Sequence, residues 1–119
     1  MVTLMASHRI EKINVQIQRE LSLIIQQKMK DNRLNKDTLS ITHVKTTPDL
    51  KMATVYISVF GTTKEKEVAL DALDYAKGFL RSCLGKVMKT HMIPALTFKL
   101  DDSIEYGMHI DEILAGLKK

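Results

Sequence analysis

Three cations and a glycine follow one another at steps of four residues in the second half of the chain: Lys77, Arg81, Gly85 and Lys89. In a helix, this spacing places them along one slowly rotating face. Lysine and arginine neutralise phosphate groups, and a glycine between them has no side chain that would keep a ligand away from the helix. The face is therefore suited to hold the phosphate backbone of a nucleic acid. The alternative is an ordinary solvated face, with Gly85 allowing another helix to pack closely.

The distribution of charge favours the phosphate-binding interpretation. The chain carries 18 Lys and Arg against 14 Asp and Glu, a net charge of +4, and residues 75–100 contain no acidic side chain. A helix that needs only solubility usually mixes charges of both signs. A second polar stripe, spaced by three and four residues, could extend the same surface: Arg9, Lys12, Gln16 and Arg19. Because the chain has no Trp, three Phe and three Tyr, we expect contacts to the shape and backbone of a nucleic acid rather than stacking on its bases.

Residues that catalyse reactions or bind metals do not form a convincing set. Glu105, His109 and Glu112 would share one face of a last helix and could hold a metal ion, but acidic side chains at a helix start are also expected from the helix dipole. Cys83 stands among apolar helical neighbours, which favours packing over nucleophilic chemistry. We therefore predict a protein that is not an enzyme and uses no cofactor and no metal. A small metal-dependent hydrolase built on these three residues remains the least favoured alternative.

The elements that position these residues must fit one small domain. A chain of 119 residues can bury one core but not two. No apolar run reaches the roughly 20 residues that a membrane helix needs, and a single cysteine excludes an internal disulfide. We expect a cytoplasmic protein with no membrane contact, in which residues 1–6 are a disordered N-terminal extension and residues 7–119 form a single RNA-binding domain.

Apolar periodicity predicts the first half of this domain. A helix that begins near Ser7 buries one stripe of side chains: Ile10, Ile13, Ile17, Leu21 and Ile24. Residues 31–37 suit a loop, and two strands follow over residues 39–45 and 52–60. Pro48 and Asp49 supply a turn between them, which predicts a hairpin. The alternation slips at His43 and Val44, where a bulge would explain the change of phase.

The second half is predicted as helices, a strand and a further helix. Thr62 and Glu65 have the spacing of a capping box at a helix start. Gly78 interrupts the helical pattern that follows, so we predict a kink between two helices near residues 76–78. After Pro94 a third strand is predicted from Leu96, Phe98 and Leu100. The last helix would start at residue 102 or 103 and bury four side chains: Ile110, Ile113, Leu114 and Leu117.

The combined pattern resembles the ribosome-binding factor A family over nearly the whole chain, from about residue 8 to residue 117. Its most specific parts are Pro48-Asp49-Leu50 followed by Ala53-Thr54-Val55-Tyr56-Ile57, and Gly78-Phe79-Leu80-Arg81 followed by Leu84-Gly85-Lys86. Further residues follow at the family's spacings: Pro94, Leu96, Phe98, Asp101, Ser103, Glu105 and Gly107. The chain departs from the pattern in having Asn32, His91 and Ala95 where the family often has proline, arginine and glutamate.

The resemblance implies a variant type II KH domain of the α+β class. Its order would be α-β-β-α-kink-α-β plus a C-terminal helix, with the helices packed on one face of a three-stranded sheet. The kink falls on Ala76-Lys77-Gly78, where other KH domains have a Gly-x-x-Gly loop. With the cationic faces added, the residues expected to bind RNA are Arg9, Lys12, Arg19, Ala76, Lys77, Gly78, Arg81, Gly85, Lys86 and Lys89.

The resemblance also implies what this RNA is. A member of the family would be a monomer that binds the immature small ribosomal subunit and its ribosomal RNA. It would assist late maturation and processing of the 5′ end of that RNA, would matter for growth in the cold, and would have assembly GTPases as partners in its release. The alternative is a protein-docking module whose basic face is incidental.

Overall fold

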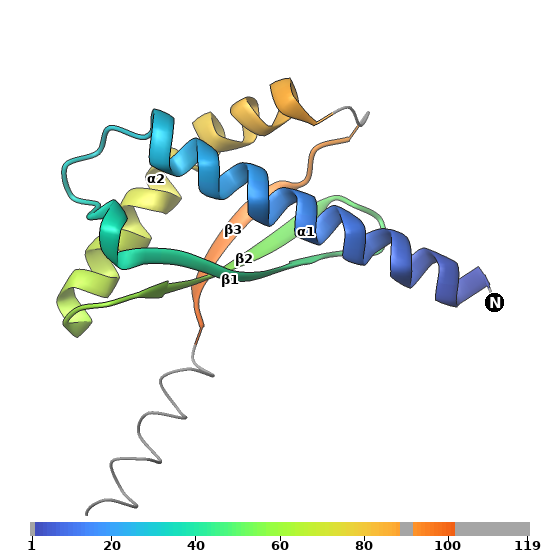
Figure 1. Ribbon diagram of the computed structural model, residues 1–119, viewed down its shortest axis with the longest axis horizontal. Helices are drawn as coiled ribbons and strands as arrows, with labels where there is room; N and C mark the ends of the chain where they lie inside the picture. The colour runs from blue at the N-terminus through green and yellow to red at the C-terminus, as the bar shows by residue number, and fades with distance from the viewer. Residues whose placement is uncertain (1, 89–91, 102–119) are drawn as a thin grey trace, which may run out of the picture.

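The computed structural model describes residues 2–88 and 92–101 of the chain (Figure 1). Its elements follow in this order: α1 (Val2–Lys28), the short 3-10 helix η1 (Lys36–Thr38), β1 (Leu39–Thr46), β2 (Met52–Val59), α2 (Thr63–Val87) and β3 (Ala95–Leu100). The last helix expected from the sequence lies outside the described residues, and so do Lys89, His91, Glu105, His109 and Glu112.

The three strands form one mixed sheet in the order β1-β2-β3. β1 and β2 pair antiparallel as the predicted hairpin, and β2 pairs parallel with β3. The register of β1 shifts between Ile41 and His43. This confirms an irregularity in the first strand, slightly earlier than the sequence predicts.

The turn between β1 and β2 is stabilised by Thr47. Its N–H donates to the carbonyl oxygen of Met52 at 2.9 Å, and its hydroxyl donates to the carboxylate of Asp49 at 2.6 Å. Leu50 has a positive φ of 60°, a left-handed conformation that is strained for a side chain of this kind. The hydrogen bonds around Thr47 hold the turn in a shape that the chain alone would not prefer.

Helix α1 packs its predicted apolar stripe into the core. Ile17 and Leu21 have no exposed surface, and Ile24 is also buried. The helix begins at Val2, five residues before the Ser7 start that the sequence suggests, so the expected start is wrong. It continues to Lys28, where the loop before β1 begins.

Helix α2 begins with the predicted capping box: the Thr62 hydroxyl accepts from the N–H of Glu65 at 3.1 Å, and the Glu65 carboxylate accepts from the N–H of Thr62 at 3.4 Å. The helix then runs without a break to Val87, so the expected division into two separate helices is wrong. Figure 1 shows that α2 nevertheless changes direction in its yellow middle part. The expected kink is therefore a bend within one continuous helix.

One buried cluster joins both helices to one face of the sheet. It contains Leu21 from α1, Leu73 and Leu84 from α2, Val55 from β2 and Phe98 from β3. In β2 the residues that alternate with the buried ones are exposed at Met52 and half-buried at the next three positions, so the helices cover only one face of the sheet. The fold is of the α+β class, as expected.

Candidate nucleic-acid interface

Gly78 leaves the outer surface of α2 bare near the middle of the helix. The residue is exposed, and a Cβ added to it would meet no atom within 4 Å. None of the described glycines has a positive φ, so an L side chain would fit here without backbone strain. Glycine costs about 1 kcal/mol relative to alanine inside an exposed helix. Because no neighbour within the described chain requires this glycine, it is suited to the close approach of an external group.

Lys77, beside this bare surface, is held by a weak ion pair. Its Nζ lies 3.2 Å from a carboxylate oxygen of Asp74, and both side chains are more than half exposed. Exposed pairs of this kind contribute about 0–1 kcal/mol. A phosphate group can therefore replace Asp74 at little cost, and Lys77 remains available to an anionic ligand.

Arg81 has a structural contact that the sequence does not predict. Its Nε and one terminal nitrogen donate to the carbonyl oxygen of Ile93 at 3.1 and 2.8 Å. The side chain is exposed but ties the segment before β3 to the side of α2. Its position on the cationic face is as expected, while its guanidinium is partly occupied in holding the fold.

Gly85 continues the surface of Gly78 and Arg81, whereas Lys86 lies about half a turn around the helix from Lys77. Gly85 is exposed, and a Cβ there would lie 3.7 Å from Cγ1 of Ile93, an ordinary van der Waals contact. Lys86 is exposed in the last turn, where a cation also complements the helix dipole. Cys83, by contrast, is buried on the other side of the helix, in agreement with a packing role.

The polar stripe of α1 lies apart from the bend of α2. Arg9, Lys12 and Arg19 are exposed as expected, and the last two line a shallow hollow together with Val15 and Gln16. In Figure 1 the N-terminal half of α1, in dark blue, reaches away from the yellow middle of α2. The structure therefore does not join the two predicted cationic stripes into one continuous surface at Gly78.

The end of α1, not its start, meets the bend of α2. A hollow of about 320 Å³ lies between them, and its lining includes Lys28, Lys30, Tyr75, Ala76 and Phe79. Of the predicted residues only Ala76 takes part. The sequence reasoning missed the two lysines and the two aromatic residues. The signal that could have revealed the aromatic pair is its spacing, because Tyr75 and Phe79 are four residues apart and lie outside the apolar stripe of α2.

Arg33 reaches the same region from the loop after α1. Its guanidinium makes a two-point contact with the Asp31 carboxylate, with distances from 2.7 to 3.2 Å, and lies over the Tyr75 ring, 5.7 Å from its centre. The side-chain hydrogen bonds from Arg33, followed by the bond from its backbone N–H, lower the pKa of Asp31 to about 2. The hydrogen bonds to Asp31 in turn raise the pKa of Arg33. The negative charge of Asp31 is thus neutralised by Arg33 within the loop.

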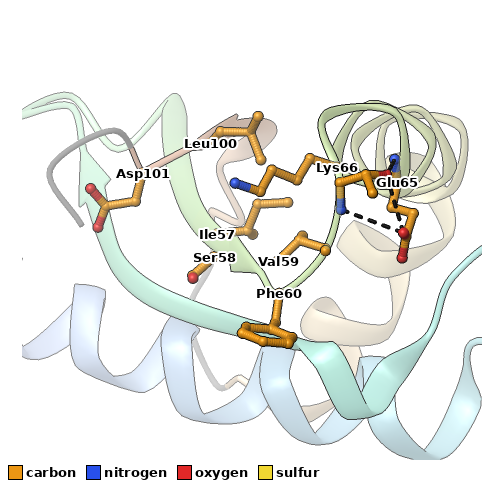
Figure 2. A pocket seen from close by; sticks show the side chains of 10 residues that line it. Ile57, Ser58, Val59, Phe60, Glu65, Lys66, Leu100 and Asp101 are labelled. Atoms are coloured by element: carbon orange, nitrogen blue, oxygen red, sulfur yellow. Dashed lines mark hydrogen bonds between the residues drawn. The ribbon is translucent and has the colours of Figure 1, made fainter. Parts of the chain in front are cut away.

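A second hollow, of about 570 Å³, lies where β2 gives way to α2 (Figure 2). Its walls are mostly apolar, with Val59, Phe60 and Leu100 among them, and the Glu65 carboxylate at its rim serves the capping box. Within residues 2–88 and 92–101 no group of three or more His, Cys, Asp or Glu side chains is placed to hold a metal ion. Nor does any helix in that part of the chain have the length and apolar character to cross a membrane.

Comparison with known proteins finds relatives that match nearly the whole chain. The family model described as "Ribosome-binding factor A" matches residues 9–114. A ribosome-binding factor A of Clostridium botulinum is 44% identical over 115 residues, which cover 97% of this chain and 95% of the relative.

Solved structures agree with the sequence comparison. The crystal structure of ribosome-binding factor A from Thermus thermophilus matches with a TM-score of 0.66 and 28% identity, covering 75% of this chain and 91% of the other. A homology model of the Thermus thermophilus factor, fitted into an electron cryo-microscopy map of its complex with the 30S subunit, matches with a TM-score of 0.62 at the same identity and coverage.

Proposed function

The chain belongs to the ribosome-binding factor A family, and from this premise we propose that it binds the small ribosomal subunit by holding ribosomal RNA against the bend of α2. The related Thermus thermophilus factor has been fitted in a complex with the 30S subunit. For the present chain, the bare helix surface at Gly78 supplies a place where an RNA backbone can approach. No catalytic step is required for this function.

The proposal rests on Gly78, a glycine in the exposed part of a helix that no contact within the described chain requires. Gly78 has no neighbour within 4 Å of an added Cβ, and the exposed cations Lys77 and Lys86 lie on the same helix. An RNA backbone at this place would make short contacts to the helix while the lysines neutralise its phosphates. Alanine at the same position would strengthen the helix but keep the RNA away.

The factor acts during subunit assembly under this proposal. It binds immature particles more tightly than mature ones, because a ligand shifts an equilibrium only through its difference in affinity for the two states. Through this preference the factor supports late maturation of the subunit and processing of the 5′ end of its RNA. It also supports growth in the cold. The protein works as a monomer in the cytoplasm, and assembly GTPases release it.

The test measures binding of the full chain to purified small-subunit particles by co-sedimentation. A Lys77→Glu/Lys86→Glu variant should lose binding, since it puts two negative charges beside the RNA backbone. The matched control, Lys51→Glu/Lys64→Glu, makes the same change of net charge at two exposed positions elsewhere and should bind nearly as the wild type does. Arg81 is left in place because of its contact with Ile93.

Salt dependence and particle preference complete the test. Affinity should fall steeply with salt, because each neutralised phosphate releases counterions. A flat salt response, or equal loss in the control variant, would instead favour a protein-docking module with an incidental basic face. Equal affinity for immature and mature particles would contradict the role in assembly.

A further inference from the structure

Two aromatic side chains are exposed to solvent beside the bend of α2. Tyr75 is 84% exposed and Phe79 is 51% exposed, one helical turn apart on the same helix. Burying an aromatic side chain is favourable, and neither ring is buried in the core, so neither is explained by the folding of the described chain. Together with Ala76 they form one wall of the hollow of about 320 Å³ at the end of α1.

The opposite wall of this hollow is basic. It carries Lys28, the last residue of α1, and Lys30 in the loop that follows. Within the described residues, neither lysine ammonium group makes an ion pair or a side-chain hydrogen bond. The one acidic residue of the lining, Asp31, is bound by Arg33. The hollow therefore combines exposed aromatic rings with two uncommitted positive charges.

The Tyr75 ring has one contact with a cation of the described chain. The Arg33 guanidinium lies over it, and Arg33 is itself fixed by its two-point contact with Asp31. Arg33 is not part of the lining of the hollow, so it leaves the hollow open. Most of the Tyr75 ring surface therefore remains open to a flat ligand.

We propose that this hollow receives an unpaired nucleobase of the bound RNA, stacked on Tyr75, while Lys28 and Lys30 pair with the phosphates on either side of it. The inference rests on the proposed function and adds a contact that the proposed function does not specify. Single-stranded RNA segments expose unstacked bases that aromatic side chains accept. The two lysines favour RNA over a segment of a partner protein. A docked protein would have to bury both positive charges without a partner or supply acidic side chains of its own.

The site also adjoins the surface that the proposed function assigns to the RNA backbone. Tyr75 lines the hollow, and the bare surface of Gly78 follows three residues later on α2, a spacing that makes the two residues neighbours on the helix surface. A strand of RNA that crosses the helix at Gly78 can therefore place one base in the hollow. The proposal departs from the expectation from composition that base stacking plays little part.

The first test introduces a fluorescent reporter into the hollow. The chain has no tryptophan, so Tyr75→Trp makes the new indole the only one in the protein. Two probes are used: small-subunit ribosomal RNA freed of protein, and intact small-subunit particles. We expect the indole fluorescence to be quenched by both. A response to intact particles without a response to free RNA would overturn the proposal and indicate a protein partner at this surface.

The second test separates the ring from the charge. Tyr75→Leu keeps an apolar side chain but removes the aromatic face, and it should weaken binding to the particles about tenfold, within the range for one stacked base. Tyr75→Phe should bind as the wild type does. The salt dependence should be the same in all three proteins, because stacking releases no counterions.

A matched control removes an exposed ring elsewhere. Phe60 is 83% exposed and lies at the other hollow, where β2 ends (Figure 2), so Phe60→Leu should leave binding unchanged. Thermal unfolding checks that each variant is folded. Wild-type affinity in Tyr75→Leu overturns the stacking proposal and leaves the proposed function intact. A wild-type chain that binds neither probe overturns both.

Discussion

Replacing Gly78 by alanine should make the protein more stable and less able to bind the ribosomal subunit. An added Cβ meets no atom within 4 Å, and Gly78 has no positive φ, so the change introduces neither a clash nor strain. Alanine is better than glycine inside an exposed helix by about 0.5–1 kcal/mol. For a domain of this size, that gain raises the midpoint of thermal unfolding by about 2–6 °C.

The same methyl group should obstruct the ligand. It projects from the bare surface on which the RNA backbone is proposed to lie, and we expect a loss of affinity for small-subunit particles of about tenfold, which corresponds to about 1.4 kcal/mol. Calorimetry measures the first effect and co-sedimentation the second. Because stability and binding are expected to change in opposite directions, loss of binding could not be ascribed to unfolding.

Two results would refute this reasoning. A lower unfolding temperature for Gly78→Ala would mean that the bend of α2 itself needs the glycine, as glycine positions in kinked helices sometimes do. Unchanged affinity would mean that no ligand atom approaches Gly78 closely. Gly61→Ala gives a contrasting reference, because its Cβ would lie 2.8 Å from Oε2 of Glu65 and should disturb the helix cap.

Two further predictions concern side chains around the interface. Arg81→Gln should lower the free energy of unfolding by about 1 kcal/mol, since it loses the paired hydrogen bonds to Ile93; urea unfolding measures this, and a stability equal to that of the wild type would contradict the anchoring role. For Asp31, the folded-state pKa of about 2 lies below the ordinary 3.8, so its contribution to stability is present above pH 4 and is lost as the pH falls toward 2. The wild type should therefore lose more stability than Asp31→Asn when urea unfolding is compared at pH 5 and pH 2, and equal losses would argue against the contact with Arg33.

Much of the fold could be predicted because local patterns determine it. The strand predicted over residues 52–60 is present as β2 (Met52–Val59), in which Ala53, Val55, Ile57 and Val59 alternate with more exposed residues and are all buried. The capping box at Thr62 was visible from two residues at the right spacing. These signals depend on residues that are close together in the sequence, so they can be recognised without knowledge of the tertiary structure.

The bend of α2 marks the limit of such reasoning. Gly78 identified a weak point in the helix, but a glycine reveals only a lower helical preference and not whether the backbone hydrogen bonds break. Here the helix continues to Val87. The start of α1 was likewise misplaced, because Ser7 has the side chain of a capping residue and yet lies within the helix.

The composition of the candidate site was the least predictable part. Lys28 and Tyr75 are far apart in the sequence, and packing of α1 against α2 brings them to one hollow. Spacing along one helix cannot reveal a surface made by two. The role of Arg81 was hidden for the same reason, since its acceptor at Ile93 belongs to a segment that folds back along α2.

The parallel pairing of β2 with β3 determines which parts of the sheet can form first during synthesis. β1 and β2 are joined by a short turn, whereas Met52 meets its β3 partner Ala95 only after about 40 further residues, including all of α2, have been made. During synthesis the hairpin and α1 can therefore assemble early, while the edge of β2 that β3 will cover stays open. The chain is exposed to mispairing at that edge until β3 has been made.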